Sequence, residues 1–140
     1  MKPTVIDASA AAAWVLPDEA TEAAESLYAH ACMATSGFHA PQIWPWEMGN
    51  LLLMAQRRGR ISPEAPDLAL HTLAATCIQL DAQLDLHRQL QVARLAATHD
   101  LTYYDAAYLE LVLRLNGQLA SRDRKLLTAA GACGIVCLTF

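Results

Sequence analysis

Several common features are missing from this sequence of 140 residues, and each absence narrows the choice of protein class. No run of uninterrupted apolar residues approaches the ~18 that a membrane-spanning helix needs. The four cysteines form no CxxC pair and have no histidine at metal-ligand spacing, which favours free thiols in the reducing cytoplasm. The N-terminal apolar stretch superficially resembles a signal peptide, but Asp7 interrupts it. No repeat, linker or low-complexity segment is present, so a single domain spanning residues 1–140 is expected.

An excess of positive charge is also missing. Ten Lys and Arg residues face fourteen Asp and Glu residues, so the formal net charge is −4 and the chain has no global attraction for nucleic acid. Any nucleic-acid role must therefore depend on local basic patches or on metal ions. Hydrophobic residues make up 54% and charged residues 17%, which predicts an exposed apolar surface for a partner, with Trp14, Trp44 and Trp46 as candidates.

The sequence lacks the motifs of several enzyme classes. It contains no GxxxxGK[ST] phosphate loop, no GxGxxG after the first strand and no GxSxG elbow. A receiver-type phosphoacceptor would need paired acids at the first strand, where Asp7 and Ala8 stand. A haloacid-dehalogenase-like site would need an aspartate where Ser9 stands. The five histidines are scattered and suggest no catalytic role.

Strand-like and helix-like segments alternate along the chain, which predicts a parallel sheet covered by helices on both faces. Strands are expected at residues 4–6, 38–40, 77–80, 118–121 and 134–138. Helices are expected at 10–16, 18–33, 62–75, 85–98, 102–115 and 124–132, and from residue 43 into the cationic segment 56–60. Ser9 and Ser62 are the expected caps of two of them, and Leu86, Leu90 and Leu95 are expected on an apolar face.

Four acidic residues are predicted to gather at one edge of this sheet. Asp7 follows the first strand, Asp123 follows the strand at 118–121, Asp105 lies in the first turn of the helix capped by Thr102, and Glu47 lies early in the third helix. The carboxyl ends of parallel strands meet at the edge where ligands bind. Asp81, after the third strand, is interpreted as a loop acid.

Several neighbouring carboxylates raise one another's pKa and cannot all stay ionised without a cation. Oxygen ligands without Cys or His favour Mg²⁺ or Mn²⁺. Such an ion can polarise a phosphoryl oxygen and activate a water molecule, so the pattern indicates hydrolysis of nucleic acid.

Four segments, VIDAS, WPWEMGN, YYDAAYLELVLRL and LASRDRKLL, resemble the successive signatures of PIN domains, in particular those of VapC-type toxins. The resemblance covers the whole chain in the same order. It implies a PIN-like three-layer α/β/α sandwich with a central parallel sheet. It also implies an Mg²⁺- or Mn²⁺-dependent endoribonuclease that is the toxin of a type II toxin-antitoxin system, forms a homodimer and is silenced by a cognate antitoxin.

The resemblance also assigns residues. The acidic metal site would consist of Asp7, Glu47, Asp105 and Asp123. Ser121 occupies a position where the family commonly has threonine, and Ser9 and Asn50 match less specific polar positions. All three are expected to bind the substrate. The basic side chains that could contact RNA phosphates are Arg57, Arg58, Arg122, Arg124 and Lys125.

Two alternatives stay open from the sequence. One is a catalytically silent RNA-binding or scaffold module of the same fold. The other is a flavodoxin-like regulatory domain switched by phosphorylation.

Overall fold

Five parallel strands form the centre of the computed structural model, which describes residues 2–138 and 140. In space the strands follow the order β3-β2-β1-β4-β5. Their bounds are β1 Thr4–Ile6, β2 Phe38–Ala40, β3 Gln79–Leu80, β4 Gln118–Ala120 and β5 Cys137–Leu138. The α-helices are α1 Ala8–Val15, α2 Glu22–Ala31, α3 Trp44–Arg57, α4 Ala65–Ala74, α5 Leu86–His99, α6 Tyr103–Arg114 and α7 Arg124–Ala132, and a short 3₁₀ helix spans Pro17–Glu19.

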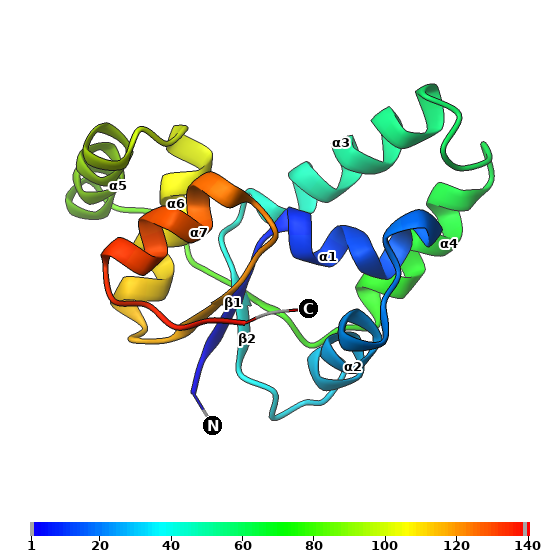
Figure 1. Cartoon of the computed structure of the whole chain (residues 1–140), viewed down its shortest axis with the longest axis horizontal. Helices are drawn as coiled ribbons and strands as arrows, with labels where there is room; N and C mark the ends of the chain where they lie inside the picture. Colours follow the sequence, from blue (N-terminus) through cyan, green and yellow to red (C-terminus); the bar gives the residue numbers. More distant parts are fainter. Residues whose placement is uncertain (1, 139) are drawn as a thin grey trace.

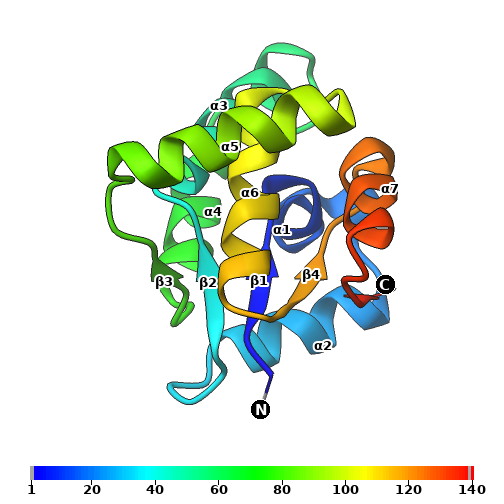
Figure 2. The same ribbon diagram turned by 90° about the vertical axis from the view of Figure 1, so that its left-hand side faces the viewer.

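The helices cover both faces of the sheet. Figure 1 shows α5, α6 and α7 on one side and α1, α2 and α4 on the other, while α3 extends beyond one end of the sheet. Figure 2 looks onto the face where α6 lies across β1 and α5 lies outside α6. This is the three-layer α/β/α arrangement with a central parallel sheet that the sequence predicts. No helix within residues 2–138 is long and apolar enough to cross a membrane.

The central strands are apolar because both of their faces are covered. Val5, Ile6, Leu119 and Ala120 are all fully buried, and such continuous apolar runs are typical of parallel strands between two helical layers. The alanine-rich helix α1 packs closely on the sheet through side chains that add little bulk. The largest fully buried side chains are Tyr108, Ile6, Leu16, Met48, Leu52, Leu109, Leu111, Leu119 and Leu126.

Helix α6 begins and ends as its sequence predicts. The Thr102 hydroxyl accepts a hydrogen bond from the backbone N–H of Asp105 at 3.1 Å and caps the first turn. At the other end, Asn116 adopts a left-handed φ of 50°. The N–H groups of Asn116 and Gly117 then bond to the carbonyls of Leu113 and Val112, which closes the helix in a Schellman motif.

Gly117 is required by a close approach of two backbone segments. A Cβ atom at this position would lie 2.5 Å from the carbonyl oxygen of Pro3. That oxygen already accepts the N–H of Gln118 at 2.8 Å, where β4 joins β1, so it cannot move without disturbing the sheet. Glycine therefore allows β4 to leave α6 and pair with β1 at once.

Gly117→Ala is expected to lower the free energy of unfolding by about 1–3 kcal/mol, the usual cost of overpacking. Gly131→Ala is the matched control, because no atom lies within 4 Å of its added Cβ and the position is helical. Alanine there should stabilise by about 0.5–1 kcal/mol. Urea unfolding followed by circular dichroism measures both, and equal stability of the two variants would refute the close-approach argument.

Several helix and strand boundaries differ from the sequence prediction. Asp7, not Ser9, caps α1, and the predicted helix at 18–33 is split into the 3₁₀ helix and α2, which Thr21 caps. Ser62 does not cap α4, which begins three residues later at Ala65. Strands β3 and β5 are also shorter than predicted.

The predicted apolar face of α5 is wrong at Leu86 and Leu90, whereas Leu95 packs against the core as predicted. Leu86 and Leu90 are 69% and 46% exposed, and the buried residue of this helix is Val92. The reason is the position of α5, which packs on α6 outside the sheet and so has a narrow covered face (Figure 2).

Candidate active site

Adjacent strands bring the first two acidic positions together. In the register of β1 and β4, Ile6 pairs with Ala120, so the next residues, Asp7 and Ser121, lie side by side at the carboxyl edge. Asp7 is only 4% exposed, and its carboxylate caps α1 by accepting the N–H of Ala10 at 2.9 Å. Asp123 caps α7 in the same way and accepts the N–H of Leu126 at 2.9 Å.

Two serines hold the Asp7 carboxylate in place. Ser121 donates to Oδ2 at 2.5 Å, and Ser9 donates to the same carboxylate at 2.8 Å. Each hydroxyl also accepts a backbone N–H, that of Asp123 at 3.0 Å for Ser121 and that of Arg122 at 2.8 Å for Ser9. A serine hydroxyl has one proton, so a hydroxyl that donates to Asp7 can only accept from the loop after β4, and the two hydroxyls also lie 3.3 Å apart.

The other two acids come from helices that start at this edge. Asp105 lies in the first turn of α6, and Glu47 lies in the first turn of α3. The phenol of Tyr108, a buried residue of α6, donates a hydrogen bond to Oε1 of Glu47 at 2.6 Å. Helical periodicity in the sequence places Tyr108 among the apolar residues of this helix. Its position three residues after Asp105, on the same face of the helix, is the signal that points to the site.

The carboxyl groups perturb one another's ionisation. Burial raises the pKa of Asp7 to about 6, against the lowering effect of hydrogen bonds from Ser121, Ala10 and Ser9, and the charge of Asp123 raises it further. Burial and then the charge of Asp123 raise the pKa of Asp105. Burial and, more weakly, the charge of Asp105 raise the pKa of Glu47, although the Tyr108 hydrogen bond lowers it. The four acids therefore form one electrostatically coupled cluster, called the acidic cluster below.

No cationic side chain among the described residues neutralises the acidic cluster. The ion pairs of residues 2–138 and 140 all involve other acids. Oxygen donors with uncompensated negative charge are the chemistry that a hard divalent cation requires. However, no three Asp, Glu, His or Cys side chains in these residues are grouped tightly enough to hold an ion as they stand. The donor chemistry thus fits a divalent metal, and coordination would require the carboxylates to move closer together.

The basic and polar residues proposed for RNA contacts divide into two groups. The guanidinium of Arg122 donates to the carbonyl of Glu19 at 3.2 Å and lies 4.9 Å from the centre of the Phe140 ring. Arg122 therefore reaches the acidic cluster through its backbone N–H, while its side chain is held elsewhere. The exposed members are Arg57, Arg58, Arg124 and Lys125, and Asn50 is also exposed on α3, where it lines a shallow hollow beside Trp46.

Asp81 is engaged outside the acidic cluster, as its interpretation as a loop acid requires. Its carboxylate accepts a hydrogen bond from Arg114 at 3.1 Å, and Arg114 also binds Glu110 at 2.8 Å. This ion pair fixes the segment after β3 to α6.

Comparison with known proteins identifies the family of this chain. A family model described as PIN domain matches residues 4–132. The chain is 32% identical to Ribonuclease VapC3 of Pyrobaculum aerophilum over 126 residues. This alignment covers 87% of this chain and 90% of the relative. The crystal structure of PAE2754 from Pyrobaculum aerophilum superimposes with a TM-score of 0.70 at 25% identity, over 97% of this chain and 83% of the other. The chain belongs to the PIN-domain family, and within it is similar to a VapC-type ribonuclease.

Proposed function

We propose that this chain is a divalent-metal-dependent endoribonuclease and the toxin of a type II toxin-antitoxin pair. The observation that carries the proposal is the acidic cluster at the carboxyl edge of the sheet. There the charge of Asp123 raises the pKa of Asp7 and of Asp105, the charge of Asp105 raises the pKa of Glu47, and no cation among the described residues neutralises these acids. A cluster of this kind costs stability at neutral pH. A function must therefore explain why the acidic cluster is present, and the name of the VapC3 relative supports ribonuclease activity as that function.

Asp7, Asp105 and Asp123 would hold the metal, with Glu47 at its side. When bound, Mg²⁺ or Mn²⁺ would supply Lewis acidity at the scissile phosphate and lower the pKa of a water molecule. The carboxylate of Asp7 is already oriented by Ser9 and Ser121, so it offers a fixed ligand. Among the described residues the carboxylate of Asp105 has one hydrogen-bond donor, the side chain of Thr102, whereas Asp7 has three, so Asp105 is less constrained and can turn toward an ion.

Glu47 is suited to move a proton. Tyr108 fixes Oε1, and the second oxygen, Oε2, accepts no hydrogen bond within residues 2–138 and 140. A carboxylate with a raised pKa is a better general base than an ordinary glutamate. In this proposal Oε2 of Glu47 takes the proton of the attacking water, while Arg124 and Lys125, exposed at the start of α7, contact the RNA backbone.

The surface also suits a protein partner in the cytoplasm. Trp46 is 79% exposed on α3, whereas Trp44 is buried and the indole N–H of Trp14 donates to the carbonyl of Ala24 at 3.0 Å. A cavity of about 380 Å³ lies between α1 and α4, and the 73% exposed Leu68 lines it. We assign this apolar region to the antitoxin, which could direct a basic side chain at Asp7, and the Trp46 surface to a second copy of the chain.

Incubation of the purified chain with end-labelled single-stranded RNA tests the activity. Cleavage is expected with Mg²⁺ or Mn²⁺ and not in the presence of a chelator. RNA binding without cleavage in either metal would support the silent scaffold module instead. Addition of the protein encoded by the adjacent small reading frame should stop cleavage, and light scattering of the chain alone should give the mass of a dimer.

A further inference from the structure

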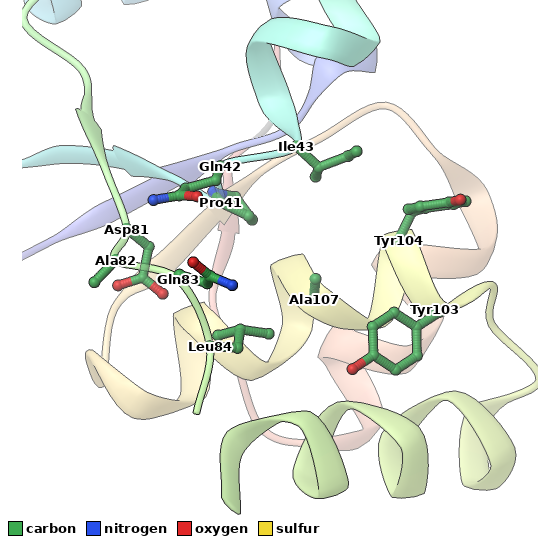
Figure 3. A pocket seen from close by; sticks show the side chains of 10 residues that line it. All are labelled: Pro41, Gln42, Ile43, Asp81, Ala82, Gln83, Leu84, Tyr103, Tyr104 and Ala107. Carbon is green, nitrogen blue, oxygen red and sulfur yellow. The ribbon is translucent and has the colours of Figure 1, made fainter. Parts of the chain in front are cut away.

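A second feature lies beside the acidic cluster, a pocket of about 240 Å³ that none of the proposed catalytic groups lines. Three segments enclose it: Pro41–Ile43 after β2, residues 81–84 after β3, and Tyr103, Tyr104 and Ala107 of α6. Figure 3 shows the two tyrosines and the segment 81–84 around the opening, with the carboxamide of Gln83 directed into the space between them. We propose that this pocket binds one unstacked nucleobase of the RNA next to the bond that is cut, an inference that rests on the proposed function.

The chemistry of the lining favours a base over a phosphate. The lining contains no lysine or arginine, and its one charged residue is the acid Asp81. The carboxamides of Gln42 and Gln83 each offer a donor and an acceptor, which is what the edge of a base requires. The volume lies below the roughly 300–1,000 Å³ of pockets for drug-sized ligands, so a single ring system fits.

The tyrosines provide surfaces for stacking. Tyr103 and Tyr104 are 44% and 58% exposed, and neither ring stacks on another aromatic ring in the described residues. Aromatic rings on a rigid element are the usual platform for bases of single-stranded RNA. Both rings project from the first turn of α6, which Thr102 caps. The backbone that carries them is therefore already ordered, and the loss of conformational entropy on binding is small.

The opposite wall is also fixed before any ligand binds. The N–H of Asp81 donates to the carbonyl of Ala40 at 2.8 Å, and its carboxylate is paired with Arg114. These contacts tie the segment 81–84 to both β2 and α6. The pocket is therefore a preformed part of the fold.

Its place relative to the acidic cluster gives the pocket its role. Tyr104 is next to Asp105 in the chain, and Ile43 is followed within one helical turn by Glu47. A nucleotide with its phosphate at the acidic cluster would have a neighbouring base within reach of this pocket. The pocket would then select which bases are tolerated beside the cleavage point.

The test uses the Asp7→Asn chain, so that RNA stays intact during the measurement. The probes are short oligouridylates that carry a single 2-aminopurine, whose fluorescence falls on stacking, moved one position at a time. Quenching is expected at one position. Tyr103→Leu or Tyr104→Leu should weaken binding of that oligonucleotide by roughly 5- to 150-fold, the measured range for loss of one base-aromatic stack.

Tyr103→Phe and Tyr104→Phe are the matched controls, because each keeps the ring and removes only the hydroxyl, which in Tyr103 donates to the carbonyl of Gln89 at 3.3 Å. Both should retain the quenching. Quenching at no position although the oligonucleotide binds, or quenching that both Leu variants retain, would overturn the base pocket. Because the readout is binding, it is independent of whether the parent chain cuts RNA. Failure of the proposed ribonuclease activity would appear in the cleavage assay instead.

Discussion

Asp7→Asn is expected to reduce RNA cleavage by about a thousandfold or more and, in metal-free buffer at pH 7.5, to make the protein more stable. When several residues act together in catalysis, the loss of one of them commonly removes most of the rate enhancement of the whole group. The gain in stability follows from the pKa of Asp7, which burial raises from 3.8 to about 6. The folded state therefore holds this proton more tightly than the unfolded state, and stability falls as the pH rises from about 4 to about 6.

The size of the gain follows from the same difference. From 3.8 to about 6 is about 2.2 pH units, and at about 1.4 kcal/mol per unit the upper bound is about 3 kcal/mol. Asparagine caps helices as well as aspartate and can keep the bond from the Ala10 N–H, so about 1–3 kcal/mol should remain. In thermal unfolding this corresponds to a rise of roughly 3–9 °C.

Asp85→Asn is the control, because Asp85 is an exposed cap of α5 that accepts the N–H of Arg88 at 2.9 Å. Its unfolding temperature and cleavage should stay near those of the parent. The difference between Asp7→Asn and the parent should also vanish near pH 4, where Asp7 is protonated in the folded state. An Asp7→Asn chain that cuts RNA at the parental rate would remove Asp7 from the catalytic machinery.

The convergence of four acids could be predicted from the sequence because topology alone requires it. Once strands and helices alternate, parallel strands place their carboxyl ends at one edge, and α6 and α3 begin at that same edge. Asp7 and Asp123 then follow neighbouring strands, while Asp105 and Glu47 lie in first helical turns. The structure brings these residues together, and their catalytic and metal-binding roles remain proposals.

Contacts between side chains could not be predicted in the same way. Periodicity classifies Tyr108 as apolar, yet its hydroxyl is the group that fixes Glu47. The basic residue Arg122 follows Ser121 directly, but its guanidinium turns to Glu19 because a partner is available there. The exposure of Leu86 and Leu90 on α5 differs from the prediction for a related reason, since no local pattern reveals whether a helix packs on the sheet or on another helix. In each of these cases the outcome depends on a contact between segments that are distant in the sequence.

Hydrogen-bond donors around the carboxylates explain how the fold tolerates the acidic cluster. Hydrogen bonds from Ser9, Ser121 and the Ala10 N–H partly offset the burial of Asp7. Asp105 has less support, because only the hydrogen bond from the Thr102 side chain lowers its pKa, while Asp123 raises it. A cation between Asp105 and Asp123 would therefore stabilise the ionised form of Asp105 more than that of Asp7, which three donors already stabilise.

Mn²⁺ is accordingly expected to raise the unfolding temperature of the parent chain, and Asp105→Asn is expected to lose most of this rise. A ligand that binds only the folded state at a hundred times its Kd adds about 2.7 kcal/mol to stability. Asp105 is half-buried, and an asparagine side chain can keep the hydrogen bond that its carboxylate receives from Thr102, so the replacement should cost the metal-free fold little. Thermal unfolding with Mn²⁺ and with a chelator measures the loss.

Cleavage by the double variant Asp7→Asn with Asp105→Asn decides whether the acids act as one site. If both ligate the same ion, each single substitution removes the function of the ion, and the double variant should cut RNA about as slowly as Asp7→Asn alone. If the loss of cleavage rate in the double variant equals the product of the losses in the two single variants, Asp7 and Asp105 have independent roles. Asp67→Asn, an exposed acid in the first turn of α4, is the control for charge, and it should keep both the Mn²⁺-dependent rise and the parental cleavage rate. An equal rise in Asp105→Asn and in the parent would exclude Asp105 as a ligand.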